Sequence, residues 1–404
     1  MKLFYHKDPI GNFGDDLNTW LWPRLIPDLL DDDDSTLFVG IGTILDNRVP
    51  DGPSKIIFGT GVGYGRFPAL DERWRICCVR GPLTAKALGL PAEMAVTDPA
   101  VLVRTVAPGM RTAGHPVSFM PHHRTKIRAI EQGLDLQSIS HDAGAHYVDP
   151  AADVEDVLRA IAGSGVVVAE AMHGAIVADA LRVPWVPVQL YDHIHNLKWR
   201  DWCSSVELEY DPLVYSVLAG EQTHQALTHF LRRAMSSSQR TLSQPTILDP
   251  RIELLQERLE ALKKGHAERC CIIGSPNLLP DPEMLQGITW LYEMQSAIRD
   301  LAEIIPVGHS FILVDQNEWG TGAILAGRQA IPFTERDGCY WGPPSDDTAA
   351  IRELERLREH GASFIVFAVP AFWWLDFYSG LLHHLHTRYR RVPAGGQMVV
   401  FELA

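Results

Sequence analysis

The chain has 404 residues, of which 46% are apolar and 21% are charged, and its formal net charge is −14. A globular chain of this length exceeds one ordinary hydrophobic core, so we expect two or three domains. A net acidic surface disfavours general affinity for nucleic acid or anionic lipid, because both need a basic surface. Any anionic substrate would therefore need a few local Arg, Lys or helix-end groups.

The cysteines and the N-terminus indicate a cytosolic protein. Four of the six cysteines form the adjacent pairs 77–78 and 270–271, while Cys203 and Cys339 stand alone. This is neither a disulfide framework nor a C-x-x-C metal site, which predicts reduced, buried thiols. The N-terminal segment turns polar at once and no apolar run reaches membrane-spanning length, so we expect no signal peptide and a soluble protein that could still work at a membrane.

Residues 1–108 predict a Rossmann-like half. Strands are expected at 2–5, 37–45, 56–58 and 76–79, and the second and third end in the glycine-rich loops Gly40-Ile41-Gly42 and Gly59-Thr60-Gly61. Such loops let the backbone approach a ligand closely. Neither loop has the G-x-G-x-x-G spacing before a helix, so NAD binding is not indicated.

Polar residues follow several of these strands. Asp15 and Asp16 lie where a helix should start, and they suit either helix capping or a ligand. Arg80 lies between a strand end and a helix whose first turn holds Pro82, a place that suits a carboxylate or phosphate ligand as well as a surface salt bridge. Asp98 is expected to cap the short helix after it.

The pattern begins again after residue 108, and residues 109–235 predict a second half. We expect a strand at 117–120, a helix at 125–132, short extended pieces at 138–141 and 147–149, and a helix at 154–161. His115, His122 and His123 cluster here, but their spacing fits no metal-ligand pair, so no metal site is expected.

Residues 165–188 read as a strand, a short helix of small residues and a second strand behind Pro184, which is typical of a buried parallel sheet. His173 would lie at the carboxyl end of the first strand, where open α/β sheets bind ligands and helix amides attract anions. An imidazole there could move protons, although a cap or a packing role also fits. Lys198 follows the last strand of this half.

Residues 236–248 predict a linker, and residues 249–404 predict an accessory α/β domain. Helices are expected at 251–264, 289–305 and 348–360, and strands at 310–314, 362–369 and 398–401. The segment 315–322 occupies the position of an S-adenosylmethionine loop but lacks its glycine spacing. A degenerate, non-catalytic domain is therefore the preferred interpretation.

The ordered motifs of residues 1–210 resemble those of polysaccharide pyruvyl transferases of the bacterial exopolysaccharide type, the ketal-forming enzymes of succinoglycan and xanthan synthesis. The matching segments are Gly11-Asn12-x-Gly14-Asp15, both glycine loops, 79–84, 98–100, 172–176 and Lys198. The resemblance implies two Rossmann-like halves in a GT-B-like arrangement. It also implies transfer of a pyruvyl group from phosphoenolpyruvate, with no further cofactor. The sequence departs from the family at Glu170-Ala171-Met172, where many members carry Ser-Arg or Ser-Met-Arg.

Phosphoenolpyruvate carries a phosphate and a carboxylate, so its site needs positive groups and backbone amides. We expect His173 to be the acid/base catalyst and the remaining candidates to bind substrate. Asn12, Asp15 and Asp16 are expected on the acceptor sugar, and Arg80 and Lys198, with Arg124 or Arg66 as further options, on the donor. His122 and Glu170 are expected in support, and Gly61 and Gly174 are the remaining substrate-binding candidates. The acceptor could be lipid-linked, which would place the protein at the inner face of the cytoplasmic membrane.

Two other functions remain open at this point. A sugar-nucleotide glycosyltransferase shares the implied shape, but a Glu-x7-Glu pair is absent because position 178 is Ala. A non-catalytic partner of a polysaccharide assembly complex would use the third region as its working surface.

Overall fold

The computed structural model describes residues 1–63, 68, 70–107, 109–110, 114–190, 196–215, 223–266, 271–275, 278, 301, 303–316, 327–394 and 398–403. The chain divides into two compact units. Unit 1 comprises Met1–Thr43, Ser54–Gly61 and Leu70–Leu278, and unit 2 comprises Ile44–Pro53, Val62–Ala69 and Leu279–Ala404. Both units are α/β, as expected, and each is described by itself.

The N-terminal half of unit 1 is built on a parallel sheet. Its strands are β1 (Lys2–Phe4), β2 (Thr36–Val39), β3 (Ser54–Phe58) and β4 (Trp74–Cys78), paired in that order, with β10 (Ile272–Ile273) antiparallel on β4. The helical elements are α1 (Phe13–Leu25), η1 (Pro27–Leu29), α2 (Pro82–Ala87), η2 (Ala92–Met94), η3 (Pro99–Leu102) and α3 (Val103–Val106). All four expected strands are confirmed, although the second ends at Val39.

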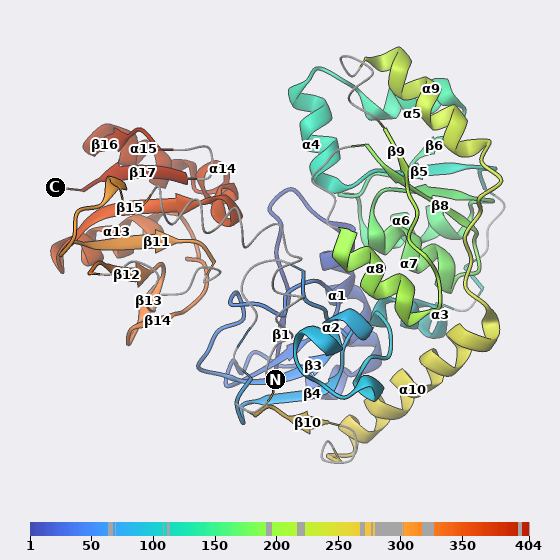
Figure 1. Cartoon of the computed structure of the whole chain (residues 1–404), viewed down its shortest axis with the longest axis horizontal. Helices are drawn as coiled ribbons and strands as arrows, with labels where there is room; N and C mark the ends of the chain where they lie inside the picture. Colours follow the sequence, from blue (N-terminus) through green and yellow to red (C-terminus); the bar gives the residue numbers. More distant parts are fainter. Residues whose placement is uncertain are drawn as a thin grey trace. The chain divides into compact units, whose positions relative to one another are not determined.

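The second half of unit 1 has a fully parallel sheet of order β6-β5-β7-β8-β9. The strands are β5 (Ser118–Met120), β6 (His146–Tyr147), β7 (Val167–Ala169), β8 (Trp185–Gln189) and β9 (Leu213–Val214). The helices are α4 (His123–Glu131), α5 (Leu136–Ala143), α6 (Val154–Ala162), α7 (Met172–Ala180), α8 (Asn196–Ser205) and α9 (His224–Met235). The strand–helix–strand prediction for 165–188 is confirmed as β7, α7 and β8. Helix α7 and strand β8 are labelled in Figure 1.

The extended piece predicted at 138–141 is wrong, because these residues lie inside α5. Asp135 caps that helix by accepting a hydrogen bond from the backbone N–H of Gln137, 3.0 Å away. Leu136 and Ile139 bury the apolar face, and Gly144 ends the helix with a φ of 89°. The short segment has too few apolar positions for its period to distinguish helix from strand.

One hydrophobic core runs through both halves of unit 1. It contains Trp22 and Phe38 from the N-terminal half together with Ile176 and Trp199 from the second. Helix α7 packs on η3 and α1, and helix α8 packs on α2, so helices of the second half lie on loops and helices of the first (Figure 1). The carboxyl ends of strands β2 to β4 therefore meet the start of α7.

Helix α10 (Pro245–Lys263) belongs to unit 1, although we expected the accessory domain to begin at residue 249. The helix packs on η3, and Arg104 of α3 forms an ion pair with Asp249 at 2.7 Å. Arg258 donates a hydrogen bond to the carbonyl oxygen of Cys77, 2.6 Å away. Charged side chains of α10 thus bind it to the N-terminal half. The domain boundaries that we expected from the sequence stay predictions.

The expectation of reduced cysteines is wrong for one pair, because Cys77 and Cys271 form a disulfide. Ile272 of β10 lies opposite Ile76 of β4 in an antiparallel register, which brings the preceding cysteine beside Cys77. The two cysteines are 194 residues apart in sequence, so spacing alone could not reveal the pair. Cys203 is buried as expected, whereas Cys339 is exposed.

Unit 2 contains a mixed sheet of order β12-β11-β15-β17-β16. Its strands are β11 (Ser310–Val314), β12 (Gln329–Pro332), β15 (Ala362–Ala368), β16 (Arg390–Val392) and β17 (Met398–Glu402). Strand β11 is parallel to β12 and β15, whereas β17 is antiparallel to both β15 and β16. The remaining elements are the hairpin β13 (Glu335–Arg336) and β14 (Cys339–Tyr340), η6 (Val369–Ala371), α13 (Asp347–Glu359), α14 (Trp373–Phe377) and α15 (Ser379–Arg388). The predicted helix at 289–305 and the loop at 315–322 lie largely outside the described residues.

A carboxylate of α13 is held by three donors in unit 2. Glu355 accepts hydrogen bonds from Tyr389 Oη at 2.6 Å, His384 Nε2 at 2.7 Å and Arg358 Nε at 2.8 Å. Burial alone would raise the pKa of Glu355, but the three hydrogen bonds outweigh burial and lower the pKa to about 2. The network joins α13 to α15 and to the residue that precedes β16.

Candidate active site

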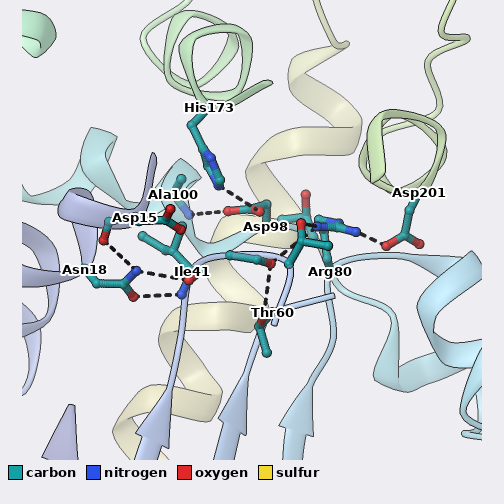
Figure 2. A network of polar contacts seen from close by, with 12 residues as sticks. Asp15, Asn18, Ile41, Thr60, Arg80, Asp98, Ala100, His173 and Asp201 are labelled. Atoms are coloured by element: carbon teal, nitrogen blue, oxygen red, sulfur yellow. Dashed lines mark hydrogen bonds and ion pairs between the residues drawn. The ribbon is translucent and has the colours of Figure 1, made fainter. Parts of the chain in front are cut away.

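The candidate site lies at the carboxyl ends of β2, β3 and β4, where these strands meet α7 and α8. Figure 2 shows His173 directed from α7 toward Asp98, and Arg80 directed toward Asp201 on α8. Strand ends and helix starts meet here because both halves are built from parallel strands joined by helices. The place agrees with the ligand-binding edge that the sequence predicted for His173.

His173 faces a buried carboxylate. Its Nε2 atom lies 3.5 Å from Oδ2 of Asp98, whose side chain is fully buried, while the His173 side chain is 14% exposed. Among the described residues, neither of these two atoms has a hydrogen-bond partner. The other oxygen of Asp98 accepts a hydrogen bond from the backbone N–H of Ala100 at 3.0 Å, which confirms the expected cap.

The first turn of α1 lies against the imidazole of His173. A Cβ atom placed on Gly14 would lie 2.1 Å from Nδ1 and 2.7 Å from Cγ of that ring, so a side chain at this position would force the ring to move. Gly14 therefore leaves the space that the ring occupies. Nε2 is buried against Asp98, whereas Nδ1 lies on the side of the ring toward Gly14.

Asp15 and Asp16 form a cluster with Asn12 at the start of α1. Asn12 donates from Nδ2 to Asp15 Oδ2 at 2.6 Å and from its backbone N–H to Asp16 Oδ2 at 3.0 Å. Burial raises the pKa of Asp16, and the nearby carboxylates of Asp15 and Asp8 raise it further against the hydrogen bond from Asn12. These three residues, predicted to bind the acceptor, thus lie together in the turn that contains Gly14.

Arg80 forms a buried ion pair. The guanidinium is fully buried, and it donates from Nε to Asp201 Oδ2 at 3.0 Å and from NH1 to Thr43 Oγ1 at 2.7 Å. A Cβ at Gly61 would lie 2.4 Å from Cζ of Arg80, so Gly61 provides the space for the guanidinium. The surface salt bridge considered from the sequence is wrong for this residue, and its role in anion binding stays a prediction.

Asp201 is a residue that sequence reasoning missed. Besides binding Arg80, it accepts hydrogen bonds from the backbone N–H of Thr84 at 2.9 Å and from Thr84 Oγ1 at 2.6 Å. The carboxylate of α8 thus caps the start of α2 in the other half. Its partner Arg80 lies 121 residues away in the sequence, and no local signal marks the pair.

Glu170 and His122, which we predicted to support the site, both accept hydrogen bonds from backbone N–H groups. Glu170 is fully buried, and its oxygens accept from the backbone N–H of His122 at 3.0 Å and of Leu190 at 2.7 Å. The side chain therefore ties the chain after β5 to the chain after β8. The His122 side chain caps α4 by accepting from the backbone N–H of Arg124 at 3.3 Å. Contacts of either residue with substrate stay predictions.

The last two candidates lie on α7 and α8. A Cβ at Gly174 would lie 2.6 Å from Sδ of Met120, so this glycine lets α7 pack closely on β5. Lys198 is 8% exposed and lies three residues before Asp201 on α8. Arg66, a further option for the donor, lies outside the described residues. Across the described part of the chain, no group of three or more His, Cys, Asp or Glu side chains could hold a metal ion.

Sequence comparisons place the chain in a known class of transferases. The chain belongs to the polysaccharide pyruvyl transferase family, whose profile matches residues 7–190 and so includes Gly14, Asp98 and His173. The succinoglycan biosynthesis protein ExoV of Rhizobium meliloti (strain 1021) is 40% identical over 217 residues, which cover 52% of this chain and 67% of that protein. No solved structure gives a significant match.

No helix among the described residues combines the length and the apolar character that a membrane span needs. Residues beyond 190, including all of α8, α9, α10 and the sheet of unit 2, lie outside the family match. Asp201 is therefore part of the site but not of the matched region.

Proposed function

We propose that this protein transfers a pyruvyl group from phosphoenolpyruvate to two hydroxyls of one sugar in an exopolysaccharide repeat unit and so forms a pyruvate ketal. The observation that carries the proposal is the imidazole of His173, which lies at the carboxyl ends of the strands with one nitrogen on Asp98. Membership of the polysaccharide pyruvyl transferase family is the reason for proposing a pyruvyl group as the transferred group and a polysaccharide unit as the acceptor.

A single group that takes and returns a proton can serve this reaction. One sugar hydroxyl adds to the enol carbon of phosphoenolpyruvate while the methylene carbon gains a proton. The second hydroxyl then closes the ring as phosphate leaves, and the departing phosphate takes the proton of that hydroxyl. The ring of His173 can accept the hydroxyl proton and return it to the methylene carbon, because an imidazole is active near neutral pH. No redox step occurs, so the proposal includes no further cofactor.

The donor needs positive charge in an acidic protein. The start of α7 offers backbone N–H groups that have no partner within the helix, and these suit a phosphate or a carboxylate. Lys198 and Arg80 remain candidates for the same anion, although Arg80 already binds Asp201. The acidic turn at Asp15 and Asp16 suits the hydroxyls of the acceptor sugar.

We further propose that the two halves of unit 1 form a GT-B-like arrangement and that the acceptor is lipid-linked. A phosphoenolpyruvate donor and a lipid-linked acceptor together favour action at the inner face of the cytoplasmic membrane. A sugar-nucleotide glycosyltransferase is the alternative with the same general shape. Binding of phosphoenolpyruvate compared with binding of nucleotide sugars separates the two.

The test combines the purified chain with phosphoenolpyruvate and lipid-linked oligosaccharides. We expect release of inorganic phosphate and a product that carries the mass of a ketal. The His173→Ala variant should lower the rate by about 100- to 10,000-fold, the usual range for general acid–base catalysis. The matched control is His141→Ala, since that side chain is 89% exposed on α5. Unchanged phosphate release in His173→Ala would show that the assignment is wrong.

A further inference from the structure

Asp98 combines full burial with one oxygen that has no hydrogen-bond partner among the described residues. Its Oδ1 accepts from Ala100, and its Oδ2 lies 3.5 Å from Nε2 of His173. A buried carboxylate oxygen without a partner is costly, so such an atom in a native fold needs an explanation. A cap requires only one oxygen, and the cap therefore does not explain why the second oxygen points at the imidazole.

We propose that Asp98 is the positioning residue of His173: it accepts the Nε2 proton, fixes the neutral ring in the Nε2–H tautomer, and leaves the lone pair on Nδ1. This inference rests on the proposed function, in which His173 moves protons. The separation of 3.5 Å is longer than an ordinary N–H···O hydrogen bond, but catalytic hydrogen bonds in ligand-free structures are often long and shorten when substrate binds.

The surroundings hold both partners in place. Ala100 fixes the plane of the Asp98 carboxylate through Oδ1, and Pro99 packs so closely that a Cβ at Gly59 would lie 2.4 Å from its Cδ. Gly14 of α1 lies close to Nδ1 and Cγ of the same ring and so limits its movement toward α1. Three segments of the chain thus define the orientation of the ring before any ligand arrives.

The tautomer decides which atom reacts. With the proton on Nε2, Nδ1 can accept the proton of the acceptor hydroxyl as the hydroxyl oxygen bonds to the enol carbon. The imidazolium then carries a proton on each nitrogen, and Asp98 stabilises that charge without taking a proton itself. Nδ1 returns its proton to the methylene carbon, so the ring ends in its starting state. When the second hydroxyl closes the ring, the bond from carbon to phosphate oxygen breaks and the departing phosphate carries away the proton of that hydroxyl, so the protons balance.

The Asp98→Asn variant tests the proposal with little change of shape. The amide oxygen can still accept from Ala100, whereas the amide NH₂ would face Nε2 and force the proton to Nδ1. Nitrogen NMR of labelled protein, assigned by loss of the signal in His173→Gln, reads the tautomer without any substrate. We expect Nε2–H in the wild type and Nδ1–H in the variant, with kcat lower by about 100- to 10,000-fold and KM for phosphoenolpyruvate within a few-fold.

The matched control is Asp153→Asn, because Asp153 caps α6 by accepting from the backbone N–H of Glu155 at 2.9 Å and lies outside this network. Its kcat and the His173 tautomer should not change. An Nδ1–H tautomer in the wild type would overturn the proposal even if Asp98→Asn failed to fold, and so would full kcat in a folded Asp98→Asn. If the wild type shows Nε2–H but His173→Ala keeps its activity, the proposed function fails while the positioning contact stands.

Discussion

The Gly14→Ala variant tests whether activity depends on the position of the His173 imidazole and not on the stability of α1. Gly14 lies in the first turn of α1, and Ala is the better helix former by about 1 kcal/mol. Helix propensity alone would therefore predict a protein at least as stable as the wild type. The new methyl group, however, would lie 2.1 Å from Nδ1 of His173, where ordinary contacts begin at 3.4 Å.

The ring would have to move by at least 3.4 − 2.1 = 1.3 Å. Misplacement of a catalytic group by about 1 Å can lower a rate by about 100-fold, and productive geometry is usually held within about 0.5 Å. We therefore expect kcat of Gly14→Ala to fall by about 100-fold, while the melting temperature changes by only a few degrees. The same displacement would lengthen the 3.5 Å separation between Nε2 and Asp98.

The assay is phosphate release from phosphoenolpyruvate with saturating acceptor, together with thermal unfolding of the same sample. Thr19→Ala is the control, since Thr19 is exposed on the same helix and should keep full activity. In the His173→Ala background, Gly14→Ala should have no further effect, because the ring that it displaces is gone. Full activity of Gly14→Ala, or an equal loss in both backgrounds, would refute the reasoning.

The remaining predictions concern stability. Asp201→Ala leaves the guanidinium of Arg80 buried without its carboxylate, which should cost about 3–5 kcal/mol and lower the melting temperature of unit 1 by roughly 10 °C. Asp249→Ala, which removes an exposed ion pair, should cost less than about 1 kcal/mol, and equal shifts in the two variants would contradict this account. Because the pKa of Glu355 is lower in the folded state than the ordinary value of 4.5, its stabilisation is complete above about pH 4.5 and disappears as the pH falls toward about 2. Chemical denaturation across that range should show this loss, and Glu355→Gln should flatten the pH dependence; an unchanged slope would contradict it.

Local patterns in the sequence were sufficient for most elements of unit 1. The buried apolar runs around Val167 and Val186 predicted two strands, and the small residues between them predicted the helix that begins beside His173. Burial on both faces of a parallel sheet gives a strong and purely local signal. The segment at 138–141 failed because four residues cannot show a period, and the cap at Asp135 decided its structure.

The partners of buried polar groups were beyond the reach of the sequence. Asp98 carried the signal of a helix cap, and nothing in its neighbourhood indicated an imidazole from the other half. Arg80 carried the signal of an anion ligand, yet the fold gives it a carboxylate 121 residues away. Such pairings depend on how helices of one half pack on loops of the other.

The sequence by itself determined the class of fold, the family and the place of His173 at a strand end, because each follows from motifs and periods within short segments. The tertiary structure alone decided which carboxylate meets which base, and which cysteine joins Cys77. A side chain finds its partner only when packed layers bring distant segments within a few ångströms, and that packing is a property of the whole core.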